Sequence, residues 1–302
     1  MAQTMPKRRL EKIGLSVTGA CVALVTLVVV ALILMVAGKG LSAFFKDGVN
    51  PLEFFAGTKW DLQNTNENGM PYVGALPLIV TSSAVMVLST LLALPIAVGS
   101  AIFAVEIKPE FGRRVFQPMV ELLVGIPSVV FGLIGFHVVV GFMKTVLGSP
   151  TGLGILPGSI VLAVMILPTI TTFSIDALRA VPASYRQGSL ALGCTRWQTI
   201  WHVVLHAAKS SLITATILGM TRAFGETLAV RMVIGGIEVM PTGLLDSAST
   251  ITTTLTTSMA VYADGSPQSD ILWSLGLLLM GMSLVFILII HFVGRKGATE
   301  RG

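Results

Sequence analysis

Long apolar runs recur along the whole chain, and they restrict its fold more than any other feature. Each run approaches or exceeds the roughly 20 residues that a helix needs to cross the hydrocarbon core of a bilayer. Charged residues make up only 12% of the 302 residues, whereas soluble domains usually contain about 25%. The chain is therefore predicted to be an all-α integral membrane protein with its core in a helix bundle within the bilayer.

Six spans can be drawn through these runs. We expect them at residues 13–37, 72–105, 115–147, 155–175, 209–234 and 271–293. The first follows a basic start, as in a signal peptide, but it is much longer than the usual 7–15 apolar residues and has no convincing A-x-A cleavage site. It is expected to be an uncleaved anchor. The two cysteines, Cys21 and Cys194, have no disulfide or metal-site spacing.

Positive charge predicts the orientation. Fourteen of the 20 Lys and Arg residues lie in four segments that we assign to the cytoplasm, around residues 7–12, 108–114, 179–209 and 295–301. Residues 235–270 contain no Lys or Arg, but they carry four carboxylates. Since Lys and Arg are enriched in cytoplasmic loops, both termini should be cytoplasmic. The expected parts are an N-terminus (1–12), a first helix (13–37), an external loop (38–71), a core with five further spans (72–293) and a C-terminus (294–302).

Proline and glycine interrupt several spans. Pro77 and Pro95 fall in the second, Pro127 in the third and Pro168 in the fourth, and each proline removes a backbone donor. The glycine-rich stretch GIPSVVFGLIGF, residues 125–136, has two interpretations of equal weight: close helix packing, or the lining of a transport path. Ala93, Ala97 and Ala101 form a small-residue stripe that favours close helix packing.

Three of the ionisable residues within the expected spans are functional candidates, because charge is costly there and usually functional. Glu121 is near the start of the third span, and Arg222 is 13 residues beyond Lys209, or about 20 Å along a helix. Glu226 follows Arg222 by four residues, so the two should share a helix face. They form either a structural ion pair or a path in which Arg222 binds a tetrahedral oxyanion.

A polar, basic segment at residues 176–208 separates two apolar runs. Its amphipathic pattern predicts two short helices that meet near Gly193, and such a structured cytoplasmic loop suggests a docking site for a soluble partner. The candidate docking residues are Gln187, Gly188, Ser189, Ala191, Leu192, Gly193 and Trp197. His202 and His206 have helical spacing but no third ligand, so we expect no metal and no cofactor. The chain also has no Walker motif, which indicates a non-enzymatic subunit without its own ATPase site.

The same segment resembles the EAA loop of ABC-transporter permeases, with Gln187-Gly188-Ser189 as the EAA block, Gly193 as its glycine and Leu205-His206 in place of Leu-Pro. RAFGETLAV followed by MVIGG, GALPLIVTSSAV and VGIPSVVFGLIGF further resemble the PstC-type permeases of the phosphate-specific importer. The resemblance implies a six-helix type I ABC importer permease bundle with a cytoplasmic coupling (EAA) loop in the cell (inner) membrane. It also implies four partners: a PstA-like permease, a PstB-like ATPase dimer, an external phosphate-binding protein and the lipid bilayer; no nucleic acid is expected.

Three functions remain open from the sequence. The first is an ATP-driven phosphate importer subunit with Arg222, Glu226 and Glu121 along the substrate path. The second is the same machine for another oxyanion, such as phosphonate or sulfate. The third is a self-sufficient secondary transporter with Glu226 as a proton relay, although such a protein has no use for the docking loop. Lys46, Lys59 and Trp60 are candidate contacts for the external partner.

Overall fold

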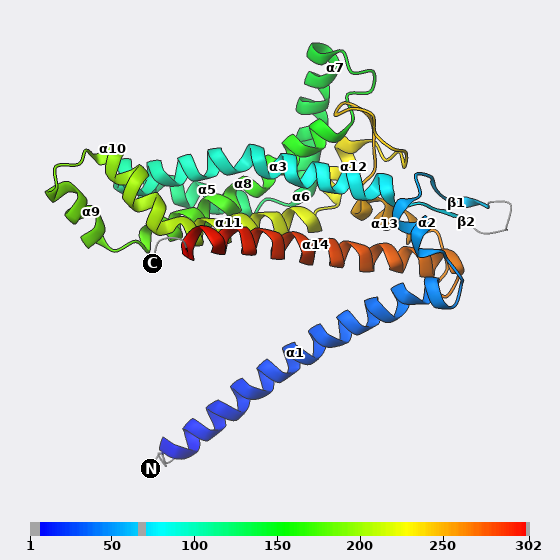
Figure 1. Cartoon of the computed structure of the whole chain (residues 1–302), viewed down its shortest axis with the longest axis horizontal. Helices are drawn as coiled ribbons and strands as arrows, with labels where there is room; N and C mark the ends of the chain where they lie inside the picture. Colours follow the sequence, from blue (N-terminus) through cyan, green and yellow to red (C-terminus); the bar gives the residue numbers. More distant parts are fainter. Residues whose placement is uncertain (1–6, 66–70, 300–302) are drawn as a thin grey trace, which may run out of the picture.

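The computed structural model describes residues 7–65 and 71–299, and the side chains of residues 11–65 and 71–292. Its longest helices are α1 (Lys7–Phe45), α3 (Leu76–Ile102), α8 (Ile155–Arg179), α11 (Leu205–Gly225) and α14 (Pro267–Thr299). Figure 1 shows α3, α8, α11 and α14 side by side along the long axis of the molecule. Within the described part of the chain, six helices are long and apolar enough to cross a membrane. The fold is that of a multi-pass membrane protein.

The centre of the bundle is the packing of α3 against α8. Ala93, Ala97 and Ala101 are fully buried, and they lie in clusters with Ile166, Ile170 and other side chains of α8. Small side chains allow two helix backbones to approach closely, which increases dispersion contact where lipid gives no hydrophobic drive. The alanine stripe is thus a packing surface, as its spacing predicts.

The prolines affect the helices differently. Pro77 is in the first turn of α3, where its missing N–H is harmless, and Pro95 and Pro168 lie inside α3 and α8 without ending them. Of these four prolines, Pro127 alone marks a break, because it is the non-helical N-cap of α6 (Ser128–Ile134), with φ −58° and ψ 137°. The expected third span at 115–147 is therefore divided.

Before this break lies the short helix α5 (Gln117–Val124); after it, α6 continues through a π-helical turn, η3 (Gly135–Val140), into α7 (Gly141–Leu147). Figure 1 shows α7 projecting sideways from the bundle. Gly132 lies directly against Ala229 and Met232, and Gly135 lies against Val161. Close packing is therefore the structural role of these two glycines.

The expected fifth span, 209–234, also needs correction. The helix is continuous over Arg196–Gly225, and Glu226 then adopts an extended conformation. A separate short helix, α12 (Leu228–Ile234), follows the break. The apolar run extends across this break because α12 is itself buried against α6 and α8, so hydropathy alone does not reveal where the helix ends.

The expected external loop is a folded cap. It contains α2 (Pro51–Ala56) and an antiparallel pair, β1 (Trp60–Thr65) and β2 (Pro71–Val73). The cap packs on α13 (Ile251–Ser258) and the start of α14, around a cluster that includes Phe54, Trp60 and Leu272. Trp60 is only 4% exposed, so it is not available as a contact for an external partner.

Helix α1 leaves the bundle at an angle and touches it only near its C-terminal end (Figure 1). There, Gly40 lies against Trp273 and Leu277 of α14, and the Ser274 hydroxyl donates to the Gly40 carbonyl over 2.6 Å. Every described side chain from residue 11 to residue 35 is exposed. Most of α1 thus presents apolar side chains to lipid or to another chain.

Candidate functional site: the docking corner and the bundle interior

The predicted pair of short helices is present. Helix α9 (Ala183–Ala191) is followed by a tight corner and by α10 (Arg196–Gln198), which continues through the π-helical turn η4 (Thr199–Val204) into α11. Figure 1 shows this corner at one end of the bundle, the end toward which the starts of α1 and the last turns of α14 also point. We call residues 183–204 the docking corner.

Local backbone chemistry fixes the corner. Gly193 has φ +84°, a left-handed conformation that favours glycine. The N–H of Cys194 donates to the Ser189 carbonyl and that of Gly193 to the Leu190 carbonyl, which is the Schellman pattern of a helix end. Thr195 and Gln198 then form a capping box that starts α10. The sequence from 189 to 198 thus ends one helix and begins the next within a few residues.

Apolar side chains project from the corner into solvent. Leu192 is 86% exposed and Trp197 is 57% exposed, and the Trp197 ring packs edge-on against that of Trp201. Large apolar patches on a soluble surface usually mark an interaction site. Gln187, Gly188, Ala191 and Gly193 are exposed on the same corner, and their role in docking stays a prediction.

Ser189 has a different position from the other docking candidates. It is buried, and its hydroxyl forms a 3.0 Å hydrogen bond with that of Thr199 in η4. Its side chain therefore holds α9 against η4 and does not face a partner. The predicted docking role of Ser189 therefore does not fit its position. A buried hydroxyl needs a hydrogen-bond partner within the protein, and Thr199 is that partner.

Arg186 forms an internal connection that its sequence neighbourhood does not reveal. Its guanidinium binds the carboxylate of Glu106, 80 residues earlier, with the shortest contact at 2.6 Å. It also donates to the carbonyls of Leu178 and Val181 at the end of α8. Both side chains of the pair are largely buried. Neighbouring residues gave no signal for this pair, because Glu106 lies at the far end of another span.

Arg222 and Glu226 do not form the expected ion pair. Because α11 ends at Gly225, the i,i+4 geometry of a continuous helix is lost at Glu226. The Arg222 guanidinium instead donates to the Thr169 hydroxyl of α8 over 2.7 Å. The Glu226 carboxylate accepts from the Ala229 N–H over 3.1 Å and so stabilises the start of α12.

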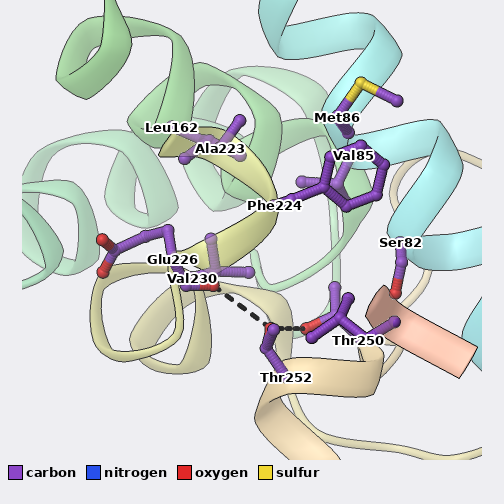
Figure 2. Close-up of a pocket in the computed structure, with 11 residues that line it drawn as sticks. Ser82, Val85, Met86, Leu162, Ala223, Phe224, Glu226, Val230, Thr250 and Thr252 are labelled. Atoms are coloured by element: carbon purple, nitrogen blue, oxygen red, sulfur yellow. Dashed lines mark hydrogen bonds between the residues drawn. The ribbon is translucent and has the colours of Figure 1, made fainter. Parts of the chain in front are cut away.

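A small cavity lies beside Glu226, between α3, α8, α11 and α13 (Figure 2). Its volume of about 20 Å³ is enough for about one water molecule, and a tetrahedral oxyanion does not fit. The lining includes Ser82, Thr250 and Thr252, and the Thr252 hydroxyl donates to the Glu226 carbonyl. In Figure 2 the Glu226 carboxylate points away from these hydroxyls. The bundle is closed at this level.

Glu121 belongs to a separate polar group. The Gln117 side-chain N–H donates to the Glu121 carboxylate over 2.9 Å. The Gln117 side-chain oxygen accepts from Arg179, at the end of α8, over 2.8 Å. Of the three predicted path residues, only Glu226 lines the cavity. The structure does not bring Arg222, Glu226 and Glu121 together.

Arg231 and Glu238 form a polar region on the cap side that the search for buried charges missed. The Arg231 guanidinium lies against Gly236, which has φ +79° and no side chain to block it. Burial raises the pKa of the Glu238 carboxyl, and the Thr254 hydroxyl and the charge of Arg231 oppose this shift. Glu238, Asp61 and Tyr262 line an open cavity of about 300 Å³. Arg231 lies nine residues after Arg222 in the same apolar run. A charge at this position is the sequence feature from which the polar region could have been predicted.

Comparisons with known proteins agree with this architecture. The family model described as "binding-protein-dependent transport system inner membrane component" matches residues 93–296. The chain is 46% identical over 290 residues to a probable ABC transporter permease protein, YqgH, of Bacillus subtilis (strain 168), covering 96% of this chain and 93% of that protein. It is 34% identical over 269 residues to the phosphate transport system permease protein PstC 1 of Mycobacterium tuberculosis (strain ATCC 25618 / H37Rv), covering 78% and 80%.

A solved structure has a similar fold. It is a bacterial ABC transporter involved in the import of the acidic polysaccharide alginate, and the TM-score is 0.57 at 17% identity over 96% of this chain and 99% of that one. At this identity the similarity concerns the fold alone. The match of the family model over most of the chain supports a narrower conclusion: the chain belongs to the family of binding-protein-dependent transport system inner membrane components, and its fold is that of an ABC-transporter permease subunit.

Proposed function

We propose that this chain is the permease subunit of an ATP-driven importer of inorganic phosphate, in which it forms half of the translocation path and couples to a separate ATPase. The observation that carries the proposal is the docking corner, a rigid exposed apolar surface at one end of a closed helix bundle. Phosphate is proposed as the cargo because a relative at 34% identity is a phosphate transport system permease protein.

The partners follow from the surfaces that remain exposed. A PstB-like ATPase dimer would bind the docking corner through Leu192 and Trp197. A PstA-like permease would cover α1 and the apolar side chains of α6 and α7, which the chain itself leaves exposed. An external phosphate-binding protein would sit on the cap. This arrangement places the docking corner and both termini in the cytoplasm, in line with the positive charge of the corner.

Arg222 remains the proposed anion ligand. It is partly buried within the bundle, and Thr169 is its one side-chain partner among the described residues. The planar guanidinium offers five N–H donors, which match the oxygens of phosphate in a fixed geometry. Exchange of a hydroxyl partner for a phosphate oxygen would cost less than separation of a buried ion pair.

The proposal is tested by uptake of radiolabelled phosphate into liposomes that contain this chain with its partner permease and ATPase. Uptake should require ATP and the external binding protein, and unlabelled sulfate or phosphonate in tenfold excess should not compete. Uptake driven by a proton gradient without ATP would favour a secondary transporter. Competition by sulfate would assign another oxyanion as cargo.

A further inference from the structure

The Arg186–Glu106 pair joins two elements of different function. Arg186 lies on α9 of the docking corner, and Glu106 lies in a π-helical turn, η1 (Phe103–Ile107), at the end of α3. The guanidinium donates to Glu106 from Nε and Nη2, at 2.6–3.2 Å. Its Nη1 donates to Val181, and Nη2 also donates to Leu178. All three nitrogens of the guanidinium therefore donate hydrogen bonds. The planar group joins α9 to η1 and to the carbonyls at the end of α8.

The opposite end of α3 is attached to α13, the helix on which the cap packs. The Ser82 hydroxyl accepts a 2.9 Å hydrogen bond from the N–H of Ile251, the first residue of α13. Ser82 and Ile251 are both buried, so this bond is protected from water. Helix α13 in turn covers the cavity beside Glu226, where Thr252 bonds to the Glu226 carbonyl. One helix thus touches both the docking corner and the cover of the closed bundle.

The element between these two attachments is continuous. The helix formed by α3 and η1 spans 32 residues, Leu76–Ile107, which is about 48 Å at 1.5 Å per residue. Pro95 does not interrupt it. Gly112 lies directly on the backbone of Ala104, so η1 is packed tightly against the segment that follows it. Tight packing transmits displacement because a close-packed interface has little free volume to absorb it.

We propose that α3 with η1 carries motion of the docked α9 to α13, and that Arg186 and Glu106 are the positioning residues that join α9 to this helix. The inference rests on the proposed function, in which an ATPase moves α9. Weakening the pair should leave the ATPase bound, because neither side chain is part of the exposed apolar surface. It should reduce the response of α13 to ATP.

The experiment follows α13 directly. In the reconstituted complex, Cys21 and Cys194 are replaced by serine and Thr254, which is 1% exposed, is replaced by cysteine. Labelling by a membrane-impermeant maleimide is measured with and without ATP, in parent, Arg186→Lys, Glu106→Gln and the double Arg186→Lys/Glu106→Gln variant. Arg114→Lys and Glu110→Gln are matched controls, since both side chains are exposed and neither forms an ion pair with a residue of the described chain.

We expect ATP to change the labelling rate in the parent and in both controls. Each single variant should reduce that change about tenfold, as expected for loss of charge-assisted hydrogen bonds, while the amount of bound ATPase stays constant. The double variant should be no worse than either single variant, because both remove one shared interaction. Phosphate taken up per ATP is measured in the same samples and should fall in parallel.

Three results would overturn the inference: no ATP-dependent labelling in the parent, an unchanged response in Glu106→Gln, or loss of bound ATPase in proportion to the lost response. The proposed function fails separately. If phosphate uptake is absent while ATP-dependent labelling of the parent and its loss in the variants persist, the cargo assignment is wrong and the transmission through α3 stands.

Discussion

At the scale of single residues, Arg222 is the proposed ligand of the transported anion. A charged side chain within a bundle is expensive unless it has partners, and this one is bonded to the neutral hydroxyl of Thr169. Among the described residues, no carboxylate lies within ion-pair distance of the Arg222 guanidinium. A guanidinium with donors in excess of its acceptors is suited to bind an anion for a short time and to release it.

Substitution of Arg222 tests this role. Arg222→Gln should abolish phosphate uptake, while the complex assembles normally, because no carboxylate is left without its partner. Arg222→Lys should also fail although it keeps the charge, since the planar fork is lost. Uptake into proteoliposomes and size-exclusion chromatography of the complex measure the two effects. Thr221→Ala, the neighbouring exposed position, is the control and should transport normally. Full uptake by Arg222→Lys would contradict the role of Arg222 as an anion ligand.

Glu238 gives a prediction for pH dependence. Its folded-state pKa is raised above the ordinary value of 4.5 by burial, so the folded protein binds the proton more tightly than the unfolded chain. Stability should therefore fall as pH rises from about 4.5 through the folded-state pKa. Glu238→Gln removes this loss and should raise the Tm by roughly 2 °C at pH 7, with no change at pH 4. Thermal unfolding of the parent and of Glu238→Gln at both pH values measures this effect. A lower Tm of Glu238→Gln at pH 7 would contradict the prediction.

At the scale of elements, the corner between α9 and α10 depends on one backbone conformation. Gly193→Ala places a side chain at φ +84°, which costs about 1 kcal/mol. ATPase recovered with the purified permease should fall about fivefold, the effect of that cost on an equilibrium. Gly141→Ala is the control, because Gly141 is helical with open space around it. Equal ATPase recovery in both variants would show that the corner tolerates a changed backbone.

The exposed apolar surface of the corner gives a second prediction at this scale. Leu192→Ser removes an apolar side chain that is 86% exposed, so the Tm of the isolated permease should change by less than about 1 °C. Its affinity for the ATPase should fall about tenfold, or about 1.4 kcal/mol, because burial of a leucine side chain in an interface is worth about 1.5–3 kcal/mol. Titration of the ATPase into permease nanodiscs measures this. Unchanged affinity would exclude Leu192 from the interface.

Much of the arrangement of elements was predictable from local pattern. The six apolar helices and the alanine stripe follow from run length and four-residue spacing. The two helix breaks did not follow, because Pro95 and Pro168 stand within intact helices while Pro127 begins one. Whether a proline breaks a helix depends on its neighbours in space. The end of α11 at Gly225 was also not predicted, and beyond it the bond from the Ala229 N–H to the Glu226 carboxylate stabilises the start of α12.

The docking corner was more predictable than the interior. Gly193, Thr195 and Gln198 act through contacts within a few residues, so their pattern determines their geometry. The partners of Arg186 and Arg222 are 80 and 53 residues away along the chain. Such pairs depend on tertiary packing, and the expected pairing of Arg222 with the nearest carboxylate was wrong for that reason.

At the scale of the whole molecule, two helices leave large apolar surfaces uncovered by the rest of the chain. Helix α1 stands away from the bundle and α7 projects from it (Figure 1), and both present apolar side chains. The interior cavity of about 20 Å³ holds no passage for an anion in this conformation. In the proposed importer, a path for phosphate would need a second permease and a change of conformation, which an ATPase bound at the docking corner would drive.

The rate of ATP hydrolysis by the reconstituted complex tests this account most directly. It is measured with the external binding protein added in three forms: empty, loaded with phosphate, and preincubated with sulfate. We predict that the phosphate-loaded form alone stimulates hydrolysis, and that stimulation is lost with Leu192→Ser. Hydrolysis that is independent of the binding protein, or equal stimulation by all three forms, would contradict a phosphate importer coupled through the docking corner.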